Sequence, residues 1–317
     1  MSDEKIVLAI DTSNYTTSVA ILTLEGVLIA NLKRPLRVKS GERGLRQSDA
    51  VFAHTVNIPD IMDEARDYIA DKKIVAVGVS EKPRNREGSY MPCFLSGVAV
   101  ARSLATALRV PLYKFSHQCG HIMAAVYSSE NYSVLDGDFM AYHVSGGTTE
   151  LVAVSPTDSA FVAETVGGTA DVNAGQIIDR IGVYMGLPFP SGKYIEELAL
   201  KNTDKIPKKK ISRKELYLNL SGVENIAIKL YDETKNKELV SAFVLDYIGR
   251  ALIEITDAMR EKFGDKPLVC AGGVMCNSII KNMLSEKYEV SFAEPSMSAD
   301  NAVGIAALTL RAYLSEK

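Results

Sequence analysis

The sequence predicts an α/β protein with two similar lobes, and three observations support this fold class. Apolar strands alternate along the chain with segments of helical length. A strand, a turn rich in Ser, Thr and Gly, and a second strand occur in DTSNYTTSVAI and again in SGGTTELVAV. A third strand and then helices follow each hairpin. The repetition indicates a duplicated domain, although unrelated hairpins also share turn residues.

In the first half we expect two strands within residues 6–23, a strand over 26–34, a helix from about Ala53 to Ala70, a strand over Ile74–Ser80, a helix over Cys93–Leu108 and a strand over 110–116. A helix that begins with two histidines follows. In the second half we expect a hairpin within 139–156, a strand over 160–167, and a strand, glycine turn and helix from Leu268–Asn277 onward. These elements predict an N-terminal lobe over residues 1–130 and a C-terminal lobe over 131–317, whose last helix packs back toward the first lobe.

Three polar or glycine-rich turns each follow an apolar strand, at Thr12–Thr17, Ser145–Thr149 and Gly272–Asn277. Backbone N–H groups in such turns and at helix N-termini bind phosphate oxygens without a cation. One such turn would be equally consistent with a tight turn that binds nothing. Three in this order are typical of the actin and sugar-kinase (ASKHA) type of ATP-binding fold, in which two lobes clamp a nucleotide.

The composition narrows the functional classes. The 317 residues, 47% of them hydrophobic, are enough for a large core. A net charge of −3 argues against a generally basic nucleic-acid-binding surface, but it leaves a local basic patch open. The four cysteines show no CxxC spacing, so a reduced, cytoplasmic chain is the simpler expectation. No apolar run reaches the about 18 residues of a membrane span, and no membrane contact is expected.

Two of the four histidines, His117 and His121, lie in HQCGH at the start of a predicted helix. Residues four positions apart share one helical face, so both imidazoles can reach one metal ion. On spacing alone they are also explained as polar residues that meet solvent or cap the core. The stretch lacks the Glu of HExxH, so zinc-protease chemistry has no support.

Several segments in one order resemble the tRNA threonylcarbamoyladenosine transferases, a family formerly called O-sialoglycoprotein endopeptidases or glycoproteases. They are IDTS, HQCGH, VSGGTTEL, GGTADVNAGQIIDRIG, GLPFPSGKYIEELA, LSGVENIA, AGGVMCN and SADNAVGIAA, from about Ile6 to Ala307. Their joint order identifies the chain as a divergent member. The resemblance implies the two-lobed ATP-binding fold and transfer of threonylcarbamoyl from threonylcarbamoyl-AMP to N6 of adenosine in tRNA, together with the family's partner proteins.

The resemblance also implies one iron or zinc ion per chain, held by His117, His121 and Asp300 of SADNA. Two imidazoles and a carboxylate are a usual first shell for either ion, with open positions for substrate. His143 stands where other members carry a tyrosine that can touch the metal, and we expect it to be a further ligand. The alternative is that His143 only points along its strand toward the cleft.

For an adenine nucleotide, as the AMP of the adenylate or as ATP or ADP, the resemblance implies a phosphate turn, a ribose contact, a nucleoside pocket and a closing turn. The implied residues are Ser145, Gly146, Gly147, Thr148, Gly175, Asp179, Gly192, Glu196, Gly272, Gly273 and Asn277. For the transfer step it indicates Asp171 together with Asp11, Thr12 and Ser13. The alternative for the glycines is tight turns without a ligand.

The first turn departs from the family pattern, because it reads DTSNYTT and not ETSCDET. Tyr15 and Thr16 replace an acidic pair whose aspartate acts in the transfer step, and a phenol or hydroxyl is a poor base near neutral pH. One alternative function is therefore carbamoyl transfer to a non-RNA acceptor. Another is a nucleotide-binding paralogue that scaffolds a partner, although such paralogues typically lack the histidine motif.

Two basic segments are candidates for tRNA contact. One contains Lys82, Arg84 and Arg86, and the other is the Lys208–Lys214 stretch of KIPKKKISRK. Such cations can hold an RNA backbone through its phosphates. Basic runs in loops are also commonly solvated surface.

Overall fold

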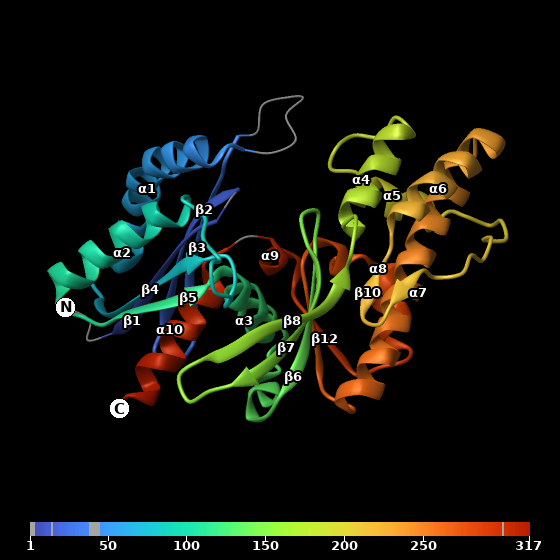
Figure 1. Ribbon diagram of the computed structural model, residues 1–317. Coiled ribbons are helices and arrows are strands. Elements are labelled where there is room, and N and C mark those ends of the chain that lie inside the picture. The colour runs from blue at the N-terminus through green and yellow to red at the C-terminus, as the bar shows by residue number, and fades with distance from the viewer. Residues whose placement is uncertain (1–3, 14, 38–44, 300) are drawn as a thin grey trace. The chain divides into compact units, whose positions relative to one another are not determined.

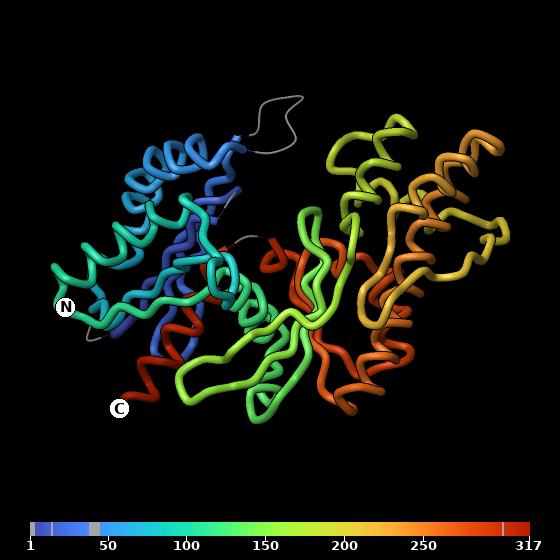
Figure 2. The backbone as a smooth tube through the Cα atoms, in the orientation of Figure 1, coloured from blue at the N-terminus to red at the C-terminus, as the bar shows by residue number. Residues whose placement is uncertain are grey.

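The structure is a computed structural model that describes residues 4–13, 15–37, 45–299 and 301–317. The chain forms two compact units, each with its own apolar core (Figures 1 and 2). Unit 1 consists of Met1–Tyr132, Ser155–Glu164 and Ala299–Lys317, and unit 2 of Ser133–Val154 and Thr165–Ser298. The C-terminal segment therefore belongs to the same unit as the N-terminal segment.

Unit 1 is built on a five-stranded sheet in the order β3-β2-β1-β4-β5. The strands are β1 (Lys5–Thr12), β2 (Thr16–Thr23), β3 (Leu28–Pro35), β4 (Lys73–Lys82) and β5 (Leu112–Ser116). The first three form an antiparallel meander, whereas β4 and β5 run parallel to β1. The carboxyl ends of β1, β4 and β5 consequently lie at one edge of the sheet.

Helices cover both faces of this sheet (Figure 1). They are α1 (Gln47–Ile69) and α2 (Phe94–Leu108) on one face, and α3 (His117–Ser129) and α10 (Val303–Ser315) on the other. The alternation along β4 shows the two faces, because Val77 and Val79 join the core under α1 and α2. Gly78 faces α10, and a Cβ added there would lie 1.8 Å from Thr309 Oγ1.

Two glycines allow α3 and α10 to approach closely. A Cβ at Gly304 of α10 would lie 1.8 Å from the carbonyl oxygen of Gly120 in α3. A Cβ at Gly120 would lie 2.9 Å from Ile305 Cδ1. This contact holds the C-terminal helix against the helix that carries His117 and His121.

A second, seven-stranded sheet runs mostly through unit 2 in the order β12-β11-β6-β7-β8-β10-β9. Its strands are β6 (Phe139–Val144), β7 (Thr149–Pro156), β8 (Phe161–Thr169), β9 (Arg213–Lys214), β10 (Tyr217–Leu218), β11 (Leu268–Ala271) and β12 (Val290–Phe292). The tip of the β7–β8 hairpin lies within Ser155–Glu164 and so belongs to unit 1.

Helices of unit 2 pack on this sheet around the long, largely buried α7. They are α4 (Ala174–Tyr184), α5 (Gly192–Ala199), α6 (Ser221–Thr234), α7 (Lys237–Phe263) and α8 (Ser278–Ser285), with shorter helices η1 (Tyr132–Asp136), η2 (Gly273–Cys276) and α9 (Pro295–Ser298). The Tyr142 hydroxyl lies 2.9 Å from Thr256 Oγ1 and so ties β6 to α7 inside the core. The buried Tyr142 hydroxyl therefore has a hydrogen-bond partner inside the packed core.

The expected strands and helices are confirmed, with shifts at their ends. The largest shift is at α1, which begins at Gln47 and not near Ala53. Its N-cap is Arg46, which makes no side-chain capping hydrogen bond, so a usual N-cap residue type is absent at this position.

Replacing Gly304 by Ala should destabilise the protein by about 1–3 kcal/mol, because the new methyl group would overlap the Gly120 carbonyl. Gly222→Ala, in α6, is the matched control, since nothing lies within 4 Å of a Cβ there. Alanine also favours helix over glycine by up to about 1 kcal/mol. Urea unfolding measures both changes, and equal stabilities for the two variants would contradict the close helix contact.

Candidate functional sites

The histidine site of unit 1 lies where three parallel strands end. Asp11 is the next-to-last residue of β1, Ser80 lies near the end of β4, and His117 follows β5 directly. The carboxyl ends of adjacent parallel strands are where α/β folds place their ligands. The Ser116 side chain accepts a hydrogen bond from Cys119 N–H and caps α3, so the two histidines sit in its first two turns.

Hydrogen bonds join these residues in a line. Ser80 Oγ donates to Asp11 Oδ1 at 2.6 Å, and Asp11 Oδ2 lies 2.7 Å from His117 Nδ1. His117 Nε2 lies 3.0 Å from His121 Nε2. Asp11 is 1% exposed and His121 6% exposed, so the line is largely shielded from water.

The two histidines fit a shared metal ion. Two nitrogen ligands at about 2.0–2.1 Å from a tetrahedral ion are about 3.3 Å apart, close to the spacing of the two Nε2 atoms. Among the residues that the structure describes, no group of three or more His, Cys, Asp or Glu side chains is arranged to hold a metal. Asp300 lies outside the described residues. His143 is a buried residue at the end of β6 in unit 2, beside Ala271 of β11 and Glu150 of β7.

The first turn is tied to the helices above it. Thr12 Oγ1 donates to the Cys93 carbonyl and accepts from Gly97 N–H, both at 3.1 Å, so α2 fixes the end of β1. The neighbouring Ser13 hydroxyl is buried and makes no hydrogen bond to any described residue. A buried hydroxyl without a partner is uncommon, and it leaves Ser13 able to bind a ligand or a water.

His54 of α1 anchors the other side of this turn. Its Nε2 lies 2.8 Å from the Ser13 carbonyl oxygen, and its Nδ1 lies 2.8 Å from Thr17 Oγ1. Because a carbonyl only accepts, Nε2 carries the proton and Nδ1 accepts from the Thr17 hydroxyl. Burial lowers the pKa of His54, against the opposing effect of the bond to Ser13. His54 is therefore a neutral structural residue.

In unit 2, Ser145–Thr148 form a closed turn after β6, with Ser145 N–H donating to the Thr148 carbonyl at 2.8 Å. The start of α4 packs against it, since a Cβ at Gly175 would lie 2.5 Å from the Ser145 carbonyl oxygen. Asn173 Nδ2 donates to the Gly147 carbonyl at 2.9 Å. Gly146 and Gly147 are exposed, and a Cβ added at either would meet nothing within 4 Å, so a ligand has room to approach this turn.

The carboxylates expected near this turn all accept backbone hydrogen bonds. Asp171 accepts from the N–H groups of Val172, Leu220 and Ser221 at 2.7, 2.8 and 3.0 Å. Burial alone would raise the pKa of Asp171, but these bonds and Ser221 outweigh it and lower the pKa to about 2. Asp171 thus fixes the start of α6 and is a weak base.

Asp179 and Glu196 each hold a neighbouring segment in place. Asp179 Oδ1 accepts from Ser191 N–H at 2.7 Å, and burial raises the pKa of Asp179 despite this bond. Glu196 Oε1 accepts from the N–H and hydroxyl of Ser278 at 2.7 and 2.5 Å, which caps α8. The turn before α8 contains Gly272, whose φ of +98° favours glycine, and Gly273, which faces open space. Asn277 caps α8 through the N–H groups of Ile279 and Ile280.

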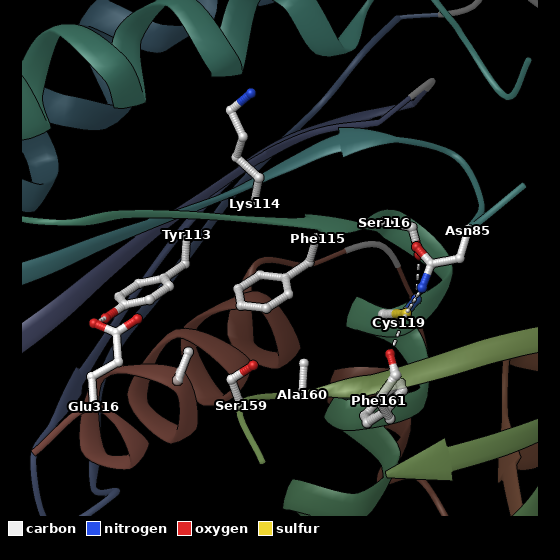
Figure 3. Close-up of a pocket in the computed structure, with 11 residues that line it drawn as sticks. Asn85, Tyr113, Lys114, Phe115, Ser116, Cys119, Ser159, Ala160, Phe161 and Glu316 are labelled. Atoms are coloured by element: carbon white, nitrogen blue, oxygen red, sulfur yellow. Dashed lines mark hydrogen bonds between the residues drawn. The ribbon is translucent and has the colours of Figure 1, made fainter. Parts of the chain in front are cut away.

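A cavity of about 280 Å³ lies beside α3 in unit 1 (Figure 3). Its lining comprises Asn85, Tyr113, Lys114, Phe115, Ser116, Cys119, Ser159, Ala160, Phe161, Ala312 and Glu316. Cys119 is two positions from each histidine, so it points to a different side of α3 from theirs. Burial raises the pKa of its thiol, although Ser116 and Asn85 oppose this. The thiol therefore ionises less readily than a free cysteine, and the cavity lies on a different side of α3 from the histidine pair.

A family model for the tRNA N6-adenosine threonylcarbamoyltransferases (TsaD) matches residues 37–307. The chain belongs to this family. A curated member from Streptococcus suis is 31% identical over 331 residues, which spans 100% of this chain and 95% of the relative. A member from Streptococcus thermophilus is 32% identical over 320 residues, which spans 96% of this chain and 90% of the relative.

Similar solved structures confirm the ASKHA-type fold. HypF from T. kodakarensis matches with a TM-score of 0.65 at 11% identity, over 99% of this chain and 48% of that one. A ROK family protein from Streptococcus pneumoniae matches with a TM-score of 0.54 at 10% identity, over 98% and 99% of the two chains. At these identities the similarity concerns the fold alone.

Tyr15 and Thr16, where the resemblance predicts an acidic pair, lie at the start of β2. Tyr15 is 43% exposed, and Thr16 is the first residue of the strand. The neighbouring Asn14 lies outside the described residues. Asp11 is hydrogen-bonded to His117, a contact that the sequence did not predict. The sequence also did not identify Ser80 as a site residue. Its position at the end of a predicted buried strand could have indicated this role.

The basic segments are partly neutralised within the protein. Lys208 pairs with the largely buried Asp246 at 2.5 Å, and Arg213 Nε lies 3.1 Å from Glu254 Oε1. Arg84 and Arg86 are exposed, as are Lys209, Lys210 and Lys214. In the described part of the chain, no helix is long and apolar enough to cross a membrane.

Lowering the pH should destabilise the protein through His54. Its pKa in the folded state is below 6.5, so the unfolded state binds the proton more readily. The contribution to the free energy of unfolding is complete above about pH 6.5 and is lost as the pH falls below that value.

His54→Gln keeps a donor for Ser13 and removes this titration. Urea unfolding of both proteins at pH 7.5 and 5.5 should show a smaller loss in the variant. Equal losses would contradict the assignment of His54 as neutral in the folded state.

Proposed function

We propose that this chain transfers a threonylcarbamoyl group from threonylcarbamoyl-AMP to N6 of adenosine in tRNA. The amine nitrogen forms a bond to the carbonyl carbon and loses one proton, while the bond from that carbon to the phosphate oxygen breaks and AMP leaves. Membership of the TsaD family supports the reaction class. The observation that carries the proposal is the pair formed by the partly buried His117 and the buried His121, with their Nε2 atoms 3.0 Å apart.

His117 and His121 would hold one iron or zinc ion, with Asp300 and His143 as further ligands. The donor set of imidazoles and a carboxylate suits either ion. When bound, such an ion would polarise a carbonyl or phosphoryl oxygen as a Lewis acid. The protein's part is to bring the two Nε2 atoms together, which the capped α3 achieves, and to hold the ring of His117 through its contact with Asp11.

The adenylate's AMP would be bound by unit 2. The turn beside α4, formed by Ser145, Gly146, Gly147 and Thr148, would receive its phosphate. Gly192 and Gly273 face open space, so a ligand could approach their backbone closely. Asp179 and Glu196 each have a second carboxylate oxygen available for ribose or base contacts beyond the bonds that hold Ser191 and Ser278.

The residues indicated for the transfer step divide into those that hold the backbone in place and those that can meet a substrate. Thr12 is bonded to α2, and Asp171 to the start of α6, so both are shape-forming. The Ser13 hydroxyl has no described partner and is the candidate for a substrate contact. Tyr15 and Thr16 do not supply a base, and the amine proton would pass to solvent or phosphate.

The tRNA backbone would be contacted by exposed cations that form no ion pair with any residue the structure describes. Arg86, Lys209, Lys210 and Lys214 are exposed and suit phosphate contacts, whereas Lys208 and Arg213 are engaged by Asp246 and Glu254. Binding through such contacts weakens as salt is raised.

Carbamoyl transfer to a non-RNA acceptor is the second candidate, and Tyr15 and Thr16 favour it. They replace the acidic pair near the acceptor position while the histidine motif is complete. The two candidates share the metal and the adenylate and differ only in the acceptor.

A transfer assay distinguishes these functions. The purified chain, loaded with iron or zinc and supplemented with the family's partner proteins, is mixed with labelled threonylcarbamoyl-AMP and unmodified tRNA that reads ANN codons. We expect label in tRNA, and a loss of more than 10²-fold on His117→Ala because one of the metal ligands is removed.

Ser129→Ala, in the last turn of α3, is the control and should retain activity. If the wild-type chain binds metal and AMP but leaves tRNA unlabelled, tRNA transfer is wrong. Label that instead appears on a small molecule or protein would establish the second candidate.

A further inference from the structure

We infer that Asp11, supported by Ser80, is the positioning residue that fixes the tautomer and ring orientation of His117 for metal binding. The inference rests on the proposed function, because it concerns the same site. It gives Asp11 a role through His117 and not as a base for the acceptor amine.

The tautomer follows from the hydrogen bond. An ionised carboxylate only accepts, so the 2.7 Å contact requires that His117 Nδ1 carries the proton. In neutral imidazole, Nε2 is then the lone-pair nitrogen. This is the atom that faces His121 Nε2 at 3.0 Å. Asp11 therefore selects the ligand-competent form of His117 before any ion arrives.

The orientation follows from how Asp11 is itself held. It lies in the central strand β1, is 1% exposed, and accepts from Ser80 Oγ through its other oxygen at 2.6 Å. Ser80 is fully buried in β4, the strand next to β1. The rigid sheet thus sets the carboxylate, and the carboxylate sets the ring plane of His117. Metal-ligating histidines commonly have such a partner on the other ring nitrogen.

Charge balance gives Asp11 a second reason to face this site. A buried carboxylate is costly unless a positive charge compensates it. Asp11 is paired with His117, and the imidazole of His117 is positive only when both ring nitrogens are protonated. A divalent cation on Nε2 would supply the charge through the same ring, so binding the ion and burying Asp11 stabilise each other.

The length of the side chain also matters. Asp11 is one methylene shorter than a glutamate, which would carry the same charge. The present contact is complete with the shorter side chain, and Ser80 fills the position on its far oxygen. Asp11→Glu would push an extra methylene into a fully buried site between β1, β4 and α3.

Metal affinity and histidine tautomer are the measurements that test this role. The zinc dissociation constant, from competition with a chelator, should rise about 10- to 100-fold in Asp11→Asn, whose amide is similar in size but neutral. Ser80→Ala should give a smaller rise. Glu81→Gln is the matched control, because it removes a carboxylate of β4 that pairs with Lys114 and not with His117. Its zinc affinity should not change.

In metal-free protein, ¹⁵N NMR of the imidazoles reports the tautomer. His117 should be protonated at Nδ1 in the wild type and should become a mixture in Asp11→Asn. Thermal unfolding of each variant confirms that the folded protein is compared.

The inference would be overturned if Asp11→Asn had the same zinc affinity and the same His117 tautomer as the wild type. It would also be overturned if the wild-type chain bound no metal. If zinc binding depends on Asp11 but no label reaches any acceptor in the transfer assay, the inference stands and the proposed function fails.

Discussion

The contact between the buried Asp11 carboxylate and His117 is the interaction on which the histidine site depends. A carboxylate that is 1% exposed must be paired, and the parallel strands β1, β4 and β5 bring Ser80 and His117 to it from two sides. The direction of each imidazole then follows from the sheet and from the capped first turn of α3. The backbone of the sheet and of α3 therefore determines how the histidine site is arranged.

Much of the remaining polar chemistry serves to fix turns. His54 and Thr12 hold the first turn from α1 and α2, while Asp171, Glu196 and Asn277 hold the starts of α6 and α8. In unit 2, Gly146, Gly147 and Gly273 are exposed in the turns that follow β6 and β11. Such an arrangement suits an anionic ligand bound by N–H groups, because the donors are rigid before the ligand binds.

The strand pattern and the motif order predicted the fold class, and the hairpins, the histidine helix and the family were confirmed. Strands are read well because apolar runs such as IVLAI are long and bounded by turn residues. The start of α1 was missed because Arg46 gives no capping signal. The close crossing at Gly120 and Gly304 could not be predicted, since it joins residues far apart in the sequence.

The candidate site was predictable as a set of residues but not as a set of roles. HQCGH identified both histidines, because helical spacing is a local property. His117 begins α3, whereas Asp11 lies in β1, and only the register of the sheet brings Asp11 to it. For the same reason the sequence could not reveal that Asp171 accepts three backbone hydrogen bonds or that Lys208 is paired with Asp246. The metal-ligand roles of Asp300 and His143 stay predictions.

X-ray absorption spectroscopy of the zinc-loaded protein tests the central claim most directly. We predict at least two imidazole nitrogens at about 2.0–2.1 Å from the ion, with one fewer in His121→Ala. A first shell without imidazole, or one that His121→Ala leaves unchanged, would contradict the account.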